Sequence, residues 1–112
     1  MTNADLAAFH AMINDYRTTK RKNLLTVSIA RTEQADRWAK RMANLRRLVH
    51  SDNFGLAENI ASGQRSVDQV FAAWLNSPSH RRNMLGPYTS FGLGCAAAAD
   101  RRRTLYWCLQ LE

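Results

Sequence analysis

The chain has 112 residues and a mass of 12.7 kDa, and 46% of its residues are hydrophobic and 22% charged. This composition excludes an intrinsically disordered chain, and the length predicts one domain over residues 1–112. No apolar run approaches the roughly 18 residues that cross a bilayer, and residues 1–9 lack the pattern of a secretory signal, so we expect neither in this chain. The net charge of +7 favours anionic partners such as nucleic acid, anionic lipid or wall polymers, although dispersed basic residues usually form a solvated surface.

Two amphipathic helices are expected in the first half of the chain. Large apolar residues recur at steps of three and four over residues 5–17, the spacing of one helical face. A longer helix is expected from about Ser28 to Leu48, with a basic outer face. Its apolar positions are Ala35, Trp38, Met42 and Leu45.

The helical spacing of apolar residues is absent from residues 49–65 and returns in the residues that follow. Residues 49–65 are expected to form a loop carrying one short strand over residues 56–61. Ser66 and Gln69 have the spacing of a capping box, so the third helix is expected to begin at Val67. Ser77 and Pro78 are typical of a helix start, and a short fourth helix is expected to end near Leu85.

The end of the chain alternates apolar and other residues, which predicts two strands over residues 91–95 and 105–111. A hairpin centred between Arg101 and Arg102 would place Cys95 directly opposite Cys108. Opposite Cβ atoms on antiparallel strands lie about 4.5 to 5.5 Å apart, which a disulfide can bridge. We therefore expect a Cys95–Cys108 disulfide, with two reduced, buried thiols as the alternative.

Three histidines and one glutamate are the candidate functional residues. His10 is expected to be an exposed or boundary side chain on the first helix. His80 lies at the start of the fourth helix, where the helix dipole disfavours protonation. Glu58 lies in an apolar strand and needs a partner, for which His50 and His80 are the natural choices. These residues could form a zinc site with an open position, a proton relay or a structural polar cluster.

The order and spacing of several motifs resemble the CAP superfamily, which groups cysteine-rich secretory proteins, antigen 5 and pathogenesis-related 1 proteins and is also called the SCP domain. The compact form resembles bacterial members. The motifs are residues 13–17 (INDYR), 57–63 (AENIASG), 74–85 (WLNSPSHRRNML) and 91–94 (FGLG), together with Ala35, Trp38-Ala39, Met42-Ala43, His50-Ser51 and Tyr106-Trp107.

This resemblance implies an α+β fold, an α-β-α sandwich with a small antiparallel sheet between helical layers. The implied core residues are Trp38, Trp74, Phe91, Tyr106 and Trp107. The resemblance also implies a cleft that in some members holds a divalent ion.

In that cleft, His50, Glu58 and His80 match three members of a His-Glu-Glu-His tetrad. The fourth position falls at Ser77, so a carboxylate is missing. The resemblance therefore implies at most three side-chain ligands to a metal such as zinc, or two histidines with Glu58 acting on water or on a ligand.

The function implied by the resemblance is that of a secreted or cell-surface binding module, more a binding protein than an enzyme. It would be a monomer with a polar His/Glu cleft for a divalent ion or small ligand, and with a small ligand, lipid or protein as partner. A hydrolase is the alternative, in which a cleft histidine activates water and Ser51 or Ser77 supplies a hydroxyl. A further alternative is binding of nucleic acid or another anionic polymer by Arg46-Arg47, Arg81-Arg82 and Arg101–Arg103, which is less favoured because the aromatic residues are better explained as core.

Overall fold

The computed structural model describes residues 1–53 and 55–112. Within them, the strands form one sheet in the order β1-β3-β4-β2. The elements in chain order are α1 (Asn3–Thr19), β1 (Thr26–Val27), α2 (Ile29–Leu45), β2 (Ala57–Ser62), α3 (Val67–Leu75), α4 (Pro78–Met84), β3 (Ser90–Ala97) and β4 (Leu105–Leu111). The expected helices and the three longer strands are confirmed, with ends shifted by a few residues.

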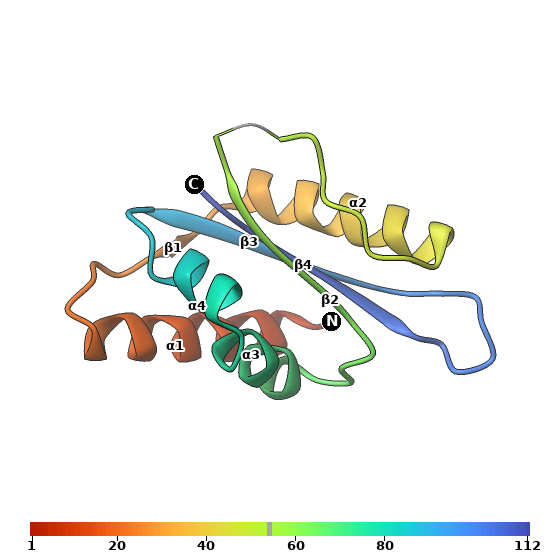
Figure 1. Cartoon of the computed structure of the whole chain (residues 1–112), viewed down its shortest axis with the longest axis horizontal. Helices are drawn as coiled ribbons and strands as arrows, with labels where there is room; N and C mark the ends of the chain where they lie inside the picture. Colours follow the sequence, from red (N-terminus) through yellow and green to blue (C-terminus); the bar gives the residue numbers. More distant parts are fainter. Residues whose placement is uncertain (54) are drawn as a thin grey trace.

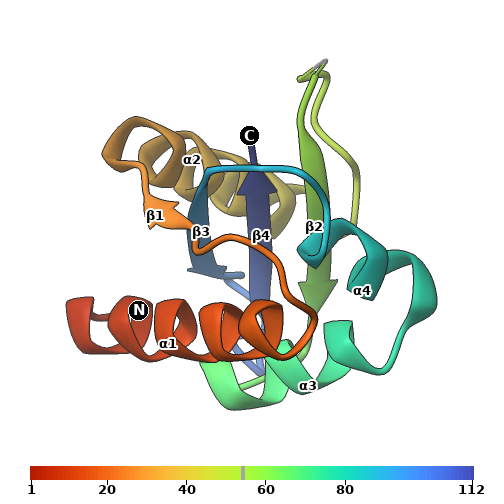
Figure 2. The same cartoon turned by 90° about the vertical axis from the view of Figure 1, so that its left-hand side faces the viewer.

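The sheet lies between two layers of helices (Figures 1 and 2), which confirms the α-β-α sandwich. α2 covers one face, and α1, α3 and α4 lie on the other. Successive side chains along β3 and β4 point alternately to the two faces of the sheet. They join two separate clusters of buried apolar residues, one beneath each helical layer. None of the helices in the described part of the chain is long and apolar enough to cross a bilayer.

The sheet is mixed, whereas an antiparallel sheet was expected. β1 pairs in parallel with β3, and the other pairings are antiparallel. β1 comprises only Thr26 and Val27, which is too short to show the alternation that reveals a strand in a sequence. Its pairing comes from the tertiary structure, which places it between α1 and α2 at the edge of the sheet.

The predicted disulfide is wrong because the β3–β4 register differs by one residue. Cys95 lies opposite Trp107, and Cys108 lies opposite Gly94, so the two thiols, both free, point to opposite faces of the sheet. The hairpin loop sets this register. Ala98 N–H donates to the Thr104 carbonyl (2.8 Å), and Asp100 accepts from the N–H (2.8 Å) and hydroxyl (2.7 Å) of Thr104. The Ala98–Thr104 pair encloses an odd number of residues, 99–103. The centre of the hairpin therefore falls on Arg101 and not between Arg101 and Arg102.

Two side chains differ in burial from expectation. Trp38, expected in the core, is half-buried, and its indole N–H donates to the Val49 carbonyl (2.7 Å). The other four aromatic residues expected in the core are buried. Arg17, one of the basic residues expected at a solvated surface, is fully buried. It links α1 to the end of α4 by donating to the carbonyls of Met84 and Gly86.

Candidate functional site

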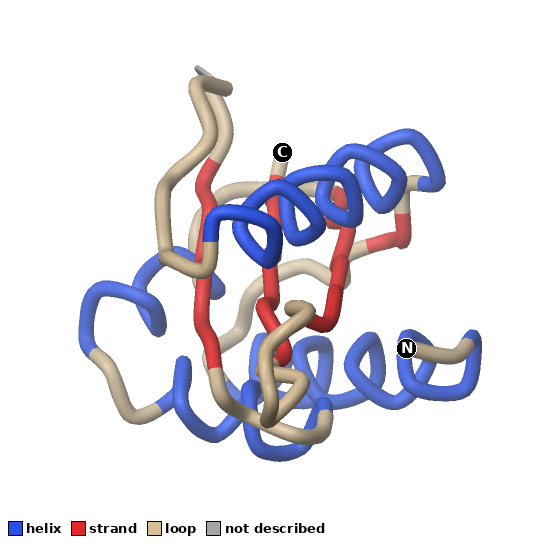
Figure 3. Tube along the Cα trace, turned by 90° about the vertical axis from the view of Figure 1, so that its right-hand side faces the viewer, coloured by secondary structure: helices blue, strands red, loops and turns tan. Residues whose placement is uncertain are grey.

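The candidate site lies at the free edge of β2, the outer strand of the sheet. Glu58 lies opposite Gln110 of β4, on the side of the strand that faces α2. The loop between α2 and β2 runs back beside β2 (Figure 3) and brings His50 and Ser51 to the Glu58 carboxylate. α4 lies on the other side of β2 and carries His80.

Glu58 is the centre of this site, and its side chain is only 8% exposed. Oε1 accepts from His50 Nδ1 (2.8 Å) and from the Ser51 N–H (2.9 Å). Oε2 accepts from the Ser51 hydroxyl (2.5 Å) and from Gln110 Nε2 (2.8 Å), and the Cys108 thiol lies 3.8 Å away. Burial raises the pKa of Glu58, but these hydrogen bonds outweigh it and leave the pKa below its ordinary value. Glu58 is therefore ionised at neutral pH.

His50 is oriented by this carboxylate. An ionised carboxylate only accepts hydrogen bonds, so Nδ1 of His50 carries the proton. In the neutral ring, Nε2 then has a free lone pair. The His50 side chain is 62% exposed, so this lone pair is accessible from solvent.

His80 is held separately from Glu58. Its Nδ1 lies 2.9 Å from the Ser77 hydroxyl, and its carbonyl accepts from Asn59 Nδ2 (3.0 Å). Asn83 Nδ2 donates in turn to Asn59 Oδ1 (2.9 Å), which joins α4 to β2. Burial, followed by the charge of His50, lowers the pKa of His80. The imidazole is therefore neutral near pH 7.

The structure brings together His50 and Glu58, as expected, but His80 contacts Ser77 and not Glu58. Within the described residues, no three His, Cys, Asp or Glu side chains are placed to hold a metal ion together. Both Glu58 oxygens are already occupied by protein donors, so a role in orienting His50 fits this carboxylate better than a role as ligand.

Sequence reasoning missed several residues of the site. Gln110 is fully buried and donates to Glu58, and Asn59 is fully buried and contacts α4. The available signal was an amide side chain within an otherwise apolar strand, which needs a partner when buried. Ser51, considered as a source of a reactive hydroxyl, donates that hydroxyl to Glu58. His10 occupies the expected boundary position, where Nε2 contacts the Leu25 carbonyl (2.7 Å).

We expect Glu58→Gln to lower the free energy of unfolding by about 2 kcal/mol at pH 7, because hydrogen bonds to a buried charge are replaced by weaker ones. The folded-state pKa of Glu58 is lowered, so its contribution is complete above the ordinary value of 4.5 and is lost as the pH falls through the folded value. Urea unfolding of both proteins at pH 7 and pH 3 measures the difference. A difference that does not shrink at pH 3 would contradict the ionised carboxylate.

Comparison with known proteins agrees with this architecture. The sequence model of the Cysteine-rich secretory protein family, CAP, matches residues 10–111. A 38-residue stretch, 33% of this chain, is 50% identical to the protein YkwD of Bacillus subtilis (strain 168), but it spans only 15% of that protein. The chain belongs to the CAP family.

Two solved structures share the fold. An outer surface protein from Borrelia burgdorferi superposes with a TM-score of 0.80 at 20% identity, over 99% of this chain and 93% of that one. An extracellular protein containing a SCP domain from Bacillus anthracis str. Ames also gives 0.80 at 20% identity, over 97% of this chain and 40% of its own length. At this identity the likeness shows the architecture alone.

Proposed function

We propose that this chain is an extracellular binding module that holds one divalent ion such as zinc between His50 and His80, with Glu58 orienting His50. The observation that carries the proposal is the hydrogen bond between His50 Nδ1 and Glu58, which leaves Nε2 free. A carboxylate on the far nitrogen of an imidazole is the usual arrangement around a metal-ligating histidine. The similarity to an outer surface protein and to an extracellular protein supports the location.

His80 is suited to be the second ligand of the ion. Its lowered pKa keeps the imidazole neutral, and a neutral imidazole is the form that binds a metal. If Nδ1 donates to the Ser77 hydroxyl, Nε2 has the free lone pair. Two protein ligands are fewer than the four of structural zinc sites, so binding should be reversible and leave positions open for oxygen atoms of a bound molecule. Such a site favours a binding module over an enzyme.

The test is a calorimetric titration of zinc into metal-free protein near pH 7. The wild type should bind with one-site stoichiometry, and the His50→Ala, His80→Ala double variant should not bind. Glu58→Gln should weaken binding by about tenfold, the effect typical of a lost carboxylate partner. His10→Gln is the matched control, because His10 lies on α1 with Nε2 on the Leu25 carbonyl, and it should bind as the wild type does.

Equal binding by the wild type and the double variant, or none by the wild type, would contradict the ion site. The Ser77–His80 contact is also the geometry of a nucleophile and a base, which is the specific support for a hydrolase. In the described residues, however, no group hydrogen-bonds to Nε2 of His80 to orient it. Ester turnover that is lost in Ser77→Ala would favour the hydrolase instead.

A further inference from the structure

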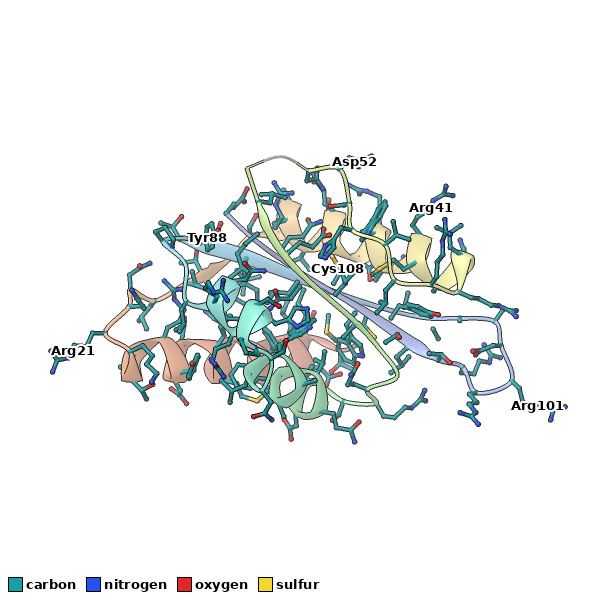
Figure 4. All side chains as sticks on the ribbon, viewed as in Figure 1. Arg21, Arg41, Asp52, Tyr88, Arg101 and Cys108 are labelled. Carbon is teal, nitrogen blue, oxygen red and sulfur yellow. The ribbon has the colours of Figure 1, made fainter. Side chains whose placement is uncertain are left out.

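Six exposed arginines gather at one end of the molecule, which we call the arginine end. They come from the end of α2, from the loop between β2 and α3 and from the β3–β4 hairpin, and are Arg46, Arg47, Arg65, Arg101, Arg102 and Arg103. Figure 4 shows Arg101 at one end of the long axis, which measures 42 Å, and Arg21 at the other. Together with Asp100, the arginine end carries +5 of the net charge of +7.

Hydrogen bonds to the hairpin hold the arginine end together. Arg46 Nη2 donates to the Ala99 carbonyl (2.9 Å), and Arg65 Nη1 donates to the Arg103 carbonyl (2.8 Å). A hollow between Arg65 and Arg102 is lined also by Gly63 and Thr104. Three separate segments thus present their guanidinium groups from one preformed surface.

The charge of the arginine end is only partly offset by nearby carboxylates, since Asp100 lies close enough to interact electrostatically with Arg46. Asp100 is the one carboxylate in the hairpin loop, and both its oxygens accept from Thr104. The ion pairs formed by the described residues involve none of the six arginines. An anionic partner is therefore the natural complement of this surface.

Two exposed leucines lie close to Arg46 and Arg47 in the chain. Leu45 is 38% exposed and Leu48 is 46% exposed, on either side of Arg46 and Arg47 in the chain. At the interface of a membrane, exposed leucines can enter the headgroup region while neighbouring basic groups meet lipid phosphates.

We propose that the arginine end docks on a phospholipid bilayer with anionic headgroups. The guanidinium groups would pair with lipid phosphates, for which their planar donors are suited, and the two leucines would enter the interface. A nucleic acid fits less well, because Tyr106 and Trp107, the aromatic residues considered for base stacking, are buried at 6% and 2% exposure. The proposal is independent of the His50–His80 ion site.

The test is co-sedimentation with vesicles of phosphatidylglycerol and phosphatidylcholine, compared with phosphatidylcholine alone. The basic variant, Arg47→Ser, Arg101→Ser, Arg102→Ser, spares the arginines whose side chains donate hydrogen bonds. It should bind the anionic vesicles about 100-fold more weakly, since each basic residue near such a surface contributes about 1 kcal/mol, a factor of about five. Wild-type binding should also fall between low and physiological salt.

The matched control removes three charges at the opposite end, by Lys20→Ser, Arg21→Asn and Lys22→Ser. Asparagine suits position 21 because its φ is 59°. Both variants have a net charge of +4 by count, so only the position of the lost charges differs. The control should bind within about threefold of the wild type, because salt screens charges beyond about 8 Å.

A third variant distinguishes binding to a bilayer from binding to a soluble anionic polymer. Leu45→Gln, Leu48→Ser should weaken vesicle binding about tenfold and leave binding of inorganic polyphosphate unchanged. Equal losses in the basic variant and its control would overturn the proposal. Vesicle binding that is unaffected in the leucine variant and is abolished by duplex DNA would also overturn it, and would assign the surface to soluble anionic polymers. Circular dichroism and melting temperatures confirm that each variant is folded.

Discussion

Gly94→Ala is expected to lower the free energy of unfolding by about 3 kcal/mol or more. Gly94 lies on β3 where α2 crosses the sheet, and a Cβ there would lie under 3.0 Å from the carbonyl carbon of Ala35 and from the nitrogen of Asp36. Adding a methylene to a close-packed interior costs about 1 to 3 kcal/mol. The cost should reach or exceed the upper value here, because the obstacle is helix main chain and cannot rotate away.

Gly86→Ala is the matched control for this substitution. A Cβ at Gly86 would also be crowded, but by the ring of Tyr88, a side chain that can change its rotamer. We expect a loss below about 1.5 kcal/mol for this variant. Urea unfolding of the three proteins measures both effects. A Gly94→Ala protein as stable as the wild type would show that α2 does not lie in main-chain contact with β3.

Arg17→Met is expected to be the second strongly destabilising change, with a loss of about 3 kcal/mol or more. The buried guanidinium donates to the carbonyls of Met84 and Gly86 (2.9 Å each) and to the carbonyl (2.8 Å) and side-chain oxygen (3.1 Å) of Asn23. Methionine fills much of the same space but donates no hydrogen bond. A buried acceptor left without a donor costs about 1 to 3 kcal/mol, and the Met84 carbonyl is among those buried.

Two further variants make this prediction specific. Arg17→Lys keeps the charge but has no planar fork, so it should recover only part of the lost stability. Lys20→Met, one turn further along the chain at an exposed position, should change stability by less than about 0.5 kcal/mol. Thermal unfolding of the set provides the comparison. Equal stabilities for Arg17→Met and Lys20→Met would show that the Arg17 hydrogen bonds contribute nothing.

The candidate site could be predicted from the sequence only in part. A glutamate in an apolar strand needs a partner, and this led correctly to His50. The same argument could not show that Ser51 and Gln110 occupy the other oxygen positions of Glu58, since these contacts depend on the loop path and on the β2–β4 register. It also could not show that His80 contacts Ser77, three residues away on the same helix start.

The sequence by itself determined the helices, the three longer strands and the CAP family, because these depend on local periodicity, capping residues and motifs that a short window contains. The tertiary structure decided the rest. A one-residue change in hairpin register separated Cys95 from Cys108. Hydrogen bonds to the carbonyls of Met84 and Gly86 hold Arg17 in the interior, and contacts between distant segments gather the arginine end. Each of these three features depends on contacts between residues far apart in the chain. The free energies of such contacts cannot be predicted from a local sequence pattern.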